Sequence, residues 1–274
     1  MVDLLRRTPL PPFDFRKDKM KNNEFYNLLL NDYDRMIDWG KRLGKEMPLL
    51  DRLFREAKVK KVLDIGSATG EHCIALAERG YEVIGIEPNF QMLQIANKKA
   101  KEKNLHIKFL KGEFSNFNKV IRGKVDALIC LGNTLAHHSD YRSLNFTLKK
   151  FYLVLRQKGL LILQVINAAS IPLGSHRYQP TRYWKDQFGE KIIIRRYQRY
   201  ERNFTELSAL RLSKEKDKWQ MEKAEQKLLA FESKRLLYLL KKAGSVSIKF
   251  YSDYDLTPFH SRKSESLLAI CEKS

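Results

Sequence analysis

The stretch VLDIGSATG, residues 62–70, decides the fold of this chain. It begins as a short apolar strand that carries the acid Asp64, and it passes through small residues into an expected helix over residues 71–79. A second strand is expected at residues 81–87 and also ends on an acid, Glu87. A strand, a glycine turn, a helix and a strand ending on an acid predict a doubly wound α/β sheet that binds a nucleoside-containing cofactor.

The loop between Gly66 and Gly70 suits close approach of a ligand. Glycine lets the backbone come near a bound molecule, and the free N–H groups of the following helix can donate to a negative group. An acid about 20 residues further on is placed to accept hydrogen bonds from ribose hydroxyls. The spacing differs from the dinucleotide fingerprint G-x-G-x-x-G, because Gly66 and Gly70 enclose three residues with Ala68 in the middle. Taken alone, such a loop is also compatible with a purely structural turn.

The pattern resembles motif I of the class I S-adenosylmethionine-dependent methyltransferases, usually written D/E-x-G-x-G-x-G. Asp64, Gly66 and Gly70 match this motif, and Ala68 stands where the middle glycine is most common. The resemblance implies an α/β fold with a Rossmann-like seven-stranded sheet, mostly parallel with the last strand antiparallel. It also implies S-adenosyl-L-methionine as the cofactor, S-adenosyl-L-homocysteine as the product and no metal.

Later family features follow in order along the chain. Glu87 and Pro88 end the second strand, and the resemblance places Glu87 on the ribose. Met92 opens the next helix, where the family packs an apolar side chain on the adenine; an ordinary core position is the alternative. Glu113, followed by Phe114, stands where the family often has an Asp that holds the adenine amino group. A solvated surface acid is the alternative for Glu113.

The fourth expected strand, residues 125–131, ends at Leu131 and runs into GNTLAH at residues 132–137. This string is similar to the glycine N-methyltransferase branch, in which it lies beside the transferring methyl group and the cofactor. By that resemblance Asn133 orients the substrate and His137 is the candidate general base. An exposed loop histidine is the alternative interpretation of His137.

Helical periodicity marks residues 22–57, and three residues there are similar to the start of the same branch. Tyr33, Trp39 and Arg42 would close over the cofactor, with Tyr33 near the reacting sulfonium. A ring face stabilises a nearby cation, and a guanidinium fork binds a carboxylate. Core aromatics and a solvated arginine are the alternative.

The pattern predicts three parts. Residues 1–57 form an N-terminal arm, at residues 1–20, and cofactor-covering helices. Residues 58–170 and 231–274 form the Rossmann-like methyltransferase domain that binds S-adenosylmethionine. Residues 171–230 break the strand–helix alternation and predict a three-stranded antiparallel β insertion that acts as a lid.

The sequence indicates the substrate less clearly than it indicates the cofactor. Ile166 stands where the glycine-methylating members carry an Arg that anchors the substrate carboxylate, although Asn167 persists. A less acidic or larger acceptor than glycine therefore fits more easily, and methylation of a nitrogen or oxygen of a small molecule is the leading hypothesis. Such transfer depends mainly on alignment of the reacting atoms. Three lid tyrosines line the substrate side or pack within the sheet: Tyr178, Tyr183 and Tyr197.

The net charge of +20 supports an alternative, an RNA (tRNA or rRNA) methyltransferase that uses the basic lid. Residues 176–243 carry 18 Lys and Arg against 9 Asp and Glu. The string RRYQRY at residues 195–200 mixes bases with aromatics, as nucleic-acid surfaces do. A Lys-rich surface of a heat-adapted protein explains the charge equally. A third hypothesis is a binding module that keeps the cofactor without turnover.

Cysteine usage indicates a reducing compartment. Cys73, Cys130 and Cys271 show neither metal-binding nor disulfide spacing, and we expect them to be buried packing residues. No apolar run approaches the roughly 20 residues that span a bilayer, and residues 1–15 lack the apolar run of a secretory signal. A cytoplasmic location without a membrane partner is the expectation. The resembling branch includes oligomers, so a homo-oligomer stays open.

Overall fold

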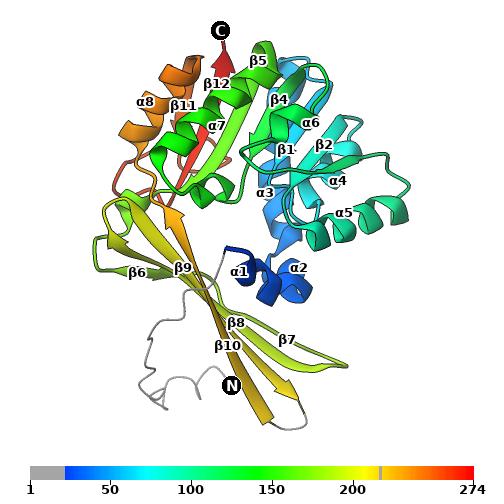
Figure 1. Cartoon of the computed structure of the whole chain (residues 1–274), viewed down its shortest axis with the longest axis vertical. Helices are drawn as coiled ribbons and strands as arrows, with labels where there is room; N and C mark the ends of the chain where they lie inside the picture. The colour runs from blue at the N-terminus through cyan, green and yellow to red at the C-terminus, as the bar shows by residue number, and fades with distance from the viewer. Residues whose placement is uncertain (1–21, 216–217) are drawn as a thin grey trace.

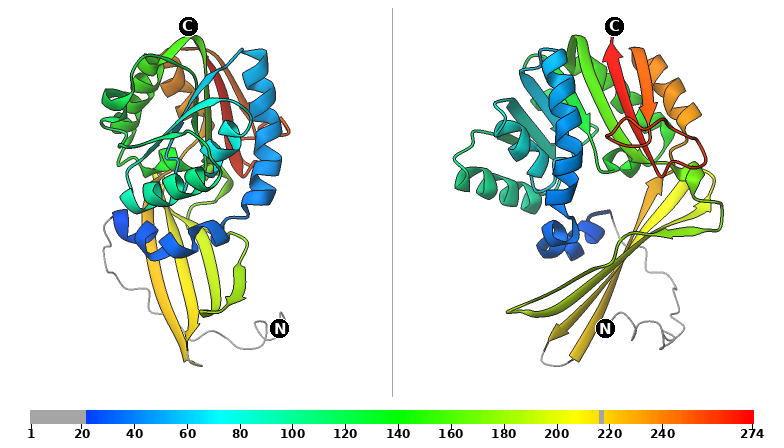
Figure 2. Two further views of the ribbon diagram at one scale, coloured as in Figure 1. Left: turned by 90° about the vertical axis from the view of Figure 1, so that its right-hand side faces the viewer. Right: turned by 180° about the vertical axis from the view of Figure 1, so that it is seen from behind.

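The computed structural model describes residues 22–215 and 218–274. A large sheet flanked by helices forms one end of the molecule, and a second, twisted sheet forms the other (Figure 1). Short N-terminal helices lie between the two sheets (Figure 2). The arm expected at residues 1–20 lies outside the described residues, and the domain limits drawn from the sequence stay predictions.

The larger sheet has the strand order β11-β12-β5-β4-β1-β2-β3. Its neighbours pair in parallel, except that β12 is antiparallel to both β5 and β11. This confirms the predicted seven-stranded Rossmann-like methyltransferase sheet. The strand order reverses between β1 and β4, and ligands bind at such a reversal. The strands are β1 (Lys61–Ile65), β2 (Glu82–Glu87), β3 (Lys108–Lys111), β4 (Val125–Cys130), β5 (Leu155–Ile166), β11 (Ser245–Tyr251) and β12 (Ser266–Lys273).

Helices cover both faces of this sheet, which explains why its central strands are continuously apolar. One core contains Leu50 and Phe54 of α3, together with residues of α4. The other contains Leu148 and Phe151 of α7, together with residues of α8. The helices are α3 (Trp39–Glu56), α4 (Glu71–Ala77), α5 (Phe90–Glu102), α6 (Phe117–Val120), α7 (Tyr141–Val154) and α8 (Ser233–Ala243).

The second sheet is antiparallel and contains five strands, so the expectation of three strands was wrong. The additional strands β6 and β7 are short, and both pair with β8, at its two ends. Strands this short carry little alternation of their own, and only pairing with β8 defines them. The five are β6 (His176–Tyr178), β7 (Arg182–Asp186), β8 (Gly189–Glu201), β9 (Phe204–Glu215) and β10 (Lys218–Leu229). We call this sheet the lid.

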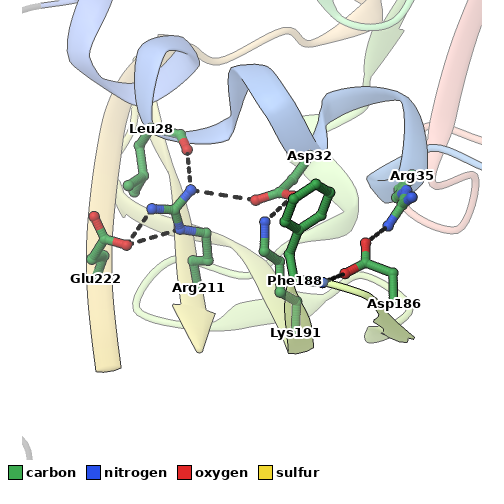
Figure 3. Close-up of polar contacts among 8 residues, drawn as sticks. All are labelled: Leu28, Asp32, Arg35, Asp186, Phe188, Lys191, Arg211 and Glu222. Atoms are coloured by element: carbon green, nitrogen blue, oxygen red, sulfur yellow. Dashed lines mark hydrogen bonds and ion pairs between the residues drawn. The ribbon is translucent and has the colours of Figure 1, made fainter. Parts of the chain in front are cut away.

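The N-terminal helices are α1 (Asn22–Leu29), the 3₁₀ helix η2 (Leu30–Asp32) and α2 (Tyr33–Met36). Ion pairs attach them to the lid, as Figure 3 shows. Asp32 is buried and accepts from Lys191 Nζ at 2.8 Å and from Arg211 at 3.3 Å. Arg211 also pairs with Glu222 of β10 and donates to the Leu28 carbonyl. The helices and three lid strands therefore share one polar junction.

The observed elements differ from the expected ones by one or two residues: α4 ends at Ala77, β2 begins at Glu82 and β4 ends at Cys130. The pairing of β4 with β5 is irregular between Val125 and Ala127. The three cysteines are free and buried, as expected. Within residues 22–215 and 218–274, the structure contains no helix with the length and apolarity that a membrane span requires.

Candidate active site

A cavity of about 780 Å³ opens at the carboxyl ends of β1, β2 and β4. Its walls include Ile65 and Gly66 after β1, Glu87 of β2 and Gly132 after β4. Helix α7 and the N-terminal helices close the other sides. The cavity therefore lies at the topological switch point, and its volume is in the range of ligand sites.

The cavity brings together many of the residues that the sequence singled out. These are Tyr33, Gly66, Ala68, Glu87, Pro88, Met92, Glu113, Phe114 and His137. Six others lie outside the lining, although all belong to the described part of the chain: Trp39, Arg42, Asp64, Gly70, Leu131 and Asn133. Proximity to the cavity does not test a role, so the assigned roles stay predictions.

Glu87 is fixed by the loop after β1. One carboxylate oxygen accepts from the Ala68 N–H at 3.0 Å, and the other accepts from the Asn89 N–H at 2.9 Å. Burial raises the pKa of Glu87 to about 7, although these two N–H groups act in the opposite direction. The carboxyl group is thus held at the cavity wall with free lone pairs for hydroxyl donors.

The backbone of the loop explains its small residues. Gly66 has a φ of +78°, and a Cβ at this position would overlap the Thr134 side chain. Ala68 also lies in the left-handed region, with a φ of 47°. That region favours glycine. This preference explains why glycine is more common than alanine at the middle position of the motif.

A flat apolar surface lies beside Glu87. Met92 is buried and lines the cavity, so it serves the core and the site together. The Phe114 ring stacks on His138, with 4.2 Å between centroids and 24° between planes. Glu113 lines the same wall but is exposed to solvent. A heteroaromatic ring such as adenine suits this surface.

His137 lies on the short helix η3 (Thr134–His137) and is not an exposed loop residue. That alternative from the sequence is wrong, because α1 packs against η3 and Tyr26 Oη lies 2.8 Å from His137 Nε2. Burial lowers the pKa of His137 to about 4. Its imidazole is therefore neutral near pH 7, and the lowered pKa makes it a weaker base than an ordinary histidine, which argues against the predicted role of general base.

Asn133 connects three strands at the edge of the site. Its backbone has a φ of 68°, and its Oδ1 accepts from the Ile166 N–H of β5 at 2.9 Å. A hydrogen bond to Asn133 lowers the pKa of Tyr197 on β8, while burial raises that pKa by more. Asn133 thus joins β4, β5 and the lid.

Arg42 reaches the rim of the cavity from α3. A Cβ on Gly132 would lie 3.0 Å from an Arg42 guanidinium nitrogen. Arg42 Nε donates to Glu46 at 2.9 Å, and its guanidinium lies 5.0 Å from the Trp39 ring centroid. Glu46 also pairs with the buried His72. Trp39 therefore supports Arg42 from outside the lining.

The remaining predicted residues shape the scaffold around the site. Asp64 is buried and accepts a hydrogen bond from Cys73 Sγ at 3.4 Å, and burial raises its pKa. Leu131 is buried, and its carbonyl accepts from Thr134 Oγ1. Gly70 begins α4.

Some lining residues carried no motif signal. Tyr26 comes from α1, and Lys150 comes from α7. The sequence also assigned no role to Asp34, which lies outside the lining. Asp34 accepts hydrogen bonds from Thr69 Oγ1 at 2.6 Å and from Trp39 Nε1 at 3.0 Å, and so joins α2 to the glycine loop. These contacts connect segments that are distant in sequence, so no local pattern could reveal them.

The basic string at residues 195–200 divides between the two faces of β8, because strand side chains alternate. Arg199 is buried and donates to the Ala168 carbonyl and to Glu232. Tyr197 is partly buried, whereas Tyr200 is exposed. Of the other lid tyrosines, Tyr178 and Tyr183 are exposed.

No cluster of three His, Cys, Asp or Glu suited to a metal ion occurs in the described ranges. The lining instead offers a carboxyl group for ribose hydroxyls, an apolar wall for a flat ring and a guanidinium at the rim for a carboxylate. These groups fit a nucleoside that carries an amino-acid end.

The seven-stranded sheet and the cavity at its switch point together are those of the class I methyltransferase fold. Residues 62–159 match the model of the methyltransferase domain family. The chain is 32% identical over 152 residues to the glycine/sarcosine N-methyltransferase of Parasynechococcus marenigrum (strain WH8102), an alignment that covers 56% of this chain and 54% of the relative. The chain thus spans about half the length of the curated relatives it matches.

Solved structures agree on the fold over nearly the whole chain. A sugar N-methyltransferase from Streptoalloteichus sp ATCC 53650 has a TM-score of 0.71 at 18% identity, covering 96% of this chain and 98% of that one. An amino pentose methyltransferase from Micromonospora echinaspora, solved with S-adenosylmethionine bound, has a TM-score of 0.69 at 16% identity, covering 94% and 100%. At these identities the likeness concerns the fold alone.

Proposed function

We propose that this chain transfers a methyl group from S-adenosylmethionine to a nitrogen of a small molecule and releases S-adenosylhomocysteine. The observation that carries the proposal is Glu87, held by the Ala68 N–H at the wall of a switch-point cavity of about 780 Å³. The relatives named above methylate glycine, sarcosine and sugars at nitrogen, by their names. The same hypothesis in its wider form also includes transfer to an oxygen of a small molecule.

The cofactor would supply an already activated methyl group, so the protein's task is alignment and exclusion of water. Glu87 would accept from the ribose hydroxyls, and Met92 and Phe114 would pack on the adenine. Arg42 would bind the carboxylate at the amino-acid end, with Tyr33 near the sulfonium. Because burial lowers the pKa of His137 to about 4, its imidazole is too weak a base to deprotonate an ammonium acceptor near pH 7, so the acceptor would have to bind as the free amine.

RNA is the weaker substrate hypothesis. The string at residues 195–200 places Arg199 in the interior, where backbone carbonyls and Glu232 satisfy its guanidinium. The string therefore offers fewer side chains to a phosphate backbone than its sequence suggests. A homo-oligomer and a cytoplasmic location stay predictions from the sequence.

The first experiment measures S-adenosylhomocysteine binding by calorimetry. Glu87→Ala should weaken binding at least tenfold, since a hydrogen bond to a charged group contributes about 1.5–3 kcal/mol. Glu82→Gln is the matched control, because Glu82 begins the same strand and is exposed. Equal affinity of wild type and Glu87→Ala would contradict the assigned site.

Transfer of labelled methyl groups into a native extract then identifies the acceptor. The extract is separated into small molecules, protein and RNA, with Gly66→Val as the blank because its side chain would collide with Thr134. Label among small molecules supports the proposal, and label in RNA replaces it. Binding without transfer to any fraction would indicate a binding module.

A further inference from the structure

Two buried polar residues, Glu46 and His72, form a hydrogen-bonded pair next to Arg42. Glu46 lies on α3 and is 5% exposed, and His72 lies on α4 and is 6% exposed. His72 Nε2 donates to one carboxylate oxygen of Glu46, and Arg42 Nε donates to the other at 2.9 Å. Neither Glu46 nor His72 lines the cavity. Any effect of this pair on a ligand must therefore pass through Arg42.

Glu46 is kept as a carboxylate inside the fold. Burial raises its pKa, but His72 and Arg42 together act more strongly and hold the pKa of Glu46 below its ordinary value. Replacement of a buried ion pair by apolar residues is often neutral or stabilising, so such a pair is weak evidence for a contribution to stability. A charge retained at this position therefore points to a use other than stability.

The contact with Glu46 occupies only one edge of the Arg42 guanidinium. Nη1 and Nη2 form no hydrogen bond with another residue of the described ranges. These two nitrogens lie next to Gly132, because a Cβ there would be 3.0 Å from Nη2 and 3.4 Å from Nη1. Gly132 itself lines the cavity. The free edge of Arg42 is thus presented at the cavity wall, where two parallel N–H donors match both oxygens of a carboxylate.

Trp39 completes the support of the guanidinium. Its ring centroid lies 5.0 Å from the guanidinium of Arg42, and its ring packs edge-on against His72, with 5.5 Å between ring centroids and 86° between planes. Trp39 and Glu46 belong to the same helix as Arg42, whereas His72 lies in the first turn of α4, directly after the glycine loop. These three side chains therefore fix the guanidinium relative to that loop.

We propose that Glu46 and His72 are positioning residues that hold Arg42 ready for the carboxylate of the cofactor, and that they thereby make the site selective for a nucleoside with an amino-acid end. The inference rests on the proposed function. An arginine that is fixed in advance loses less conformational freedom when a carboxylate binds. A nucleoside without an amino-acid end gains nothing from this arrangement. Changes at Glu46 and His72 should therefore affect the two kinds of ligand differently.

Calorimetry compares two ligands that share one nucleoside. S-adenosylhomocysteine carries the amino-acid end, and 5′-methylthioadenosine lacks it. Glu46→Leu should weaken binding of S-adenosylhomocysteine about 3- to 10-fold, as the ordering of one long side chain implies. Its affinity for 5′-methylthioadenosine should stay within about twofold of wild type, which also shows that the variant folds. Glu56→Gln is the matched control, because Glu56 is exposed at the end of the same helix.

The direction of the change separates positioning from simple charge. Removal of the Glu46 carboxylate takes away a negative charge beside Arg42, and this alone would strengthen the attraction of Arg42 for a ligand carboxylate. Weaker binding of S-adenosylhomocysteine in Glu46→Leu therefore requires that the loss of orientation outweighs the gain in attraction. Unchanged or tighter binding in this variant would overturn the proposal.

His72 provides a second pair of variants in which the ion pair of Glu46 with Arg42 is kept. His72→Leu removes one donor to Glu46 and should weaken binding of S-adenosylhomocysteine by at least about threefold, with 5′-methylthioadenosine unaffected. His72→Gln keeps an N–H donor and should restore the affinity to within about 1.5-fold of wild type. Equal affinities of His72→Leu and wild type for S-adenosylhomocysteine would overturn the role of His72. These variants keep the inference testable if Glu46→Leu does not fold.

A double-mutant cycle shows whether Glu46 acts through Arg42. Arg42→Met removes the guanidinium itself and should weaken binding of S-adenosylhomocysteine at least about tenfold, since a charge-assisted pair is lost. Glu46→Leu added to Arg42→Met should then change this affinity by less than about twofold, because no guanidinium is left to position. Additive losses would overturn the proposal.

The failure of this inference is distinct from the failure of the proposed function. Equal losses of affinity for both nucleosides in Glu46→Leu would indicate a general structural role and overturn the inference. Wild type that binds both nucleosides equally would overturn it as well, while the methyltransferase assignment would stand. Wild type that binds neither nucleoside would remove the proposed function itself.

Discussion

At the scale of single residues, Glu87 is a carboxyl group kept at the cavity wall at a cost to the fold. The carboxyl group is buried, and this desolvation is the main reason why its pKa rises from an ordinary 4.5 to about 7. The N–H groups of Ala68 and Asn89 offset part of this penalty. The remaining lone pairs face the cavity, where a ligand with hydroxyl donors would satisfy them.

This raised pKa predicts a pH-dependent stability. Between pH 4.5 and 7 the folded protein holds a proton on Glu87 that the unfolded chain has released. The contribution of Glu87 is therefore present below pH 4.5 and is lost as pH rises through about 7, by roughly 3 kcal/mol at most. Urea denaturation from pH 5 to 8 should show a smaller pH dependence for Glu87→Gln than for wild type. Identical slopes would mean that Glu87 ionises normally in the fold.

At the scale of elements, close packing between strands and the loop sets the geometry of the site. Gly85 in β2 pairs with Asp64 of β1 and with Phe109 of β3. A Cβ on Gly85 would lie 2.7 Å from the Phe109 ring and 2.9 Å from Ser67 Oγ in the glycine loop. The absence of a side chain lets β3 and the loop approach β2 together.

Gly85→Ala should therefore destabilise the protein by about 1–3 kcal/mol, the usual cost of overfilling a packed core. It should also weaken S-adenosylhomocysteine binding, because Ser67 must move. Gly44→Ala in the exposed middle of α3 is the control, since no atom lies within 4 Å of its added Cβ. That control should stabilise the protein by about 0.5–1 kcal/mol. Similar unfolding midpoints for both variants in urea would contradict the packing argument.

At the scale of the whole molecule, the N-terminal helices form a cover on one side of the cavity, and ion pairs attach this cover to the lid. Asp32 pairs with Lys191 and Arg211, and Arg35 pairs with Asp186 (Figure 3). Because Asp32 is buried while its partners keep partial contact with water, the junction depends on this carboxylate. Loss of the charge would leave Lys191 without its acid partner and Arg211 with Glu222 alone.

Asp32→Asn should lower the free energy of unfolding by roughly 1–3 kcal/mol, since Lys191 loses its acid partner while Arg211 keeps Glu222. Hydrogen exchange should rise in β8 and β9 and in the N-terminal helices together. Glu102→Gln is the control, because its pair with Lys98 is exposed and 3.9 Å long. That control should change stability by less than about 0.5 kcal/mol. A fully retained exchange pattern in Asp32→Asn would show that other contacts fix the cover.

The sequence predicted the sheet because its signals are local. Asp64, the Gly66 loop and Glu87 lie within one βαβ unit, in which the covalent chain itself brings the strand ends together. His137 was a harder case, since its exposure depended on α1 and on Tyr26, more than a hundred residues away. The strands β6 and β7 were missed for the same reason, because pairing with β8 defines them.

By itself, the sequence determined the class of fold and several of the segments that line the switch-point cavity, because apolar periodicity and glycine spacing act over a few residues. Only the tertiary structure decided that Asn133 joins β4 to β5 and that Asp32 ties the cover to the lid. These properties depend on which distant side chains are excluded from water together. Burial and charge pairing are set by the packed whole, and no short stretch of the chain encodes them alone.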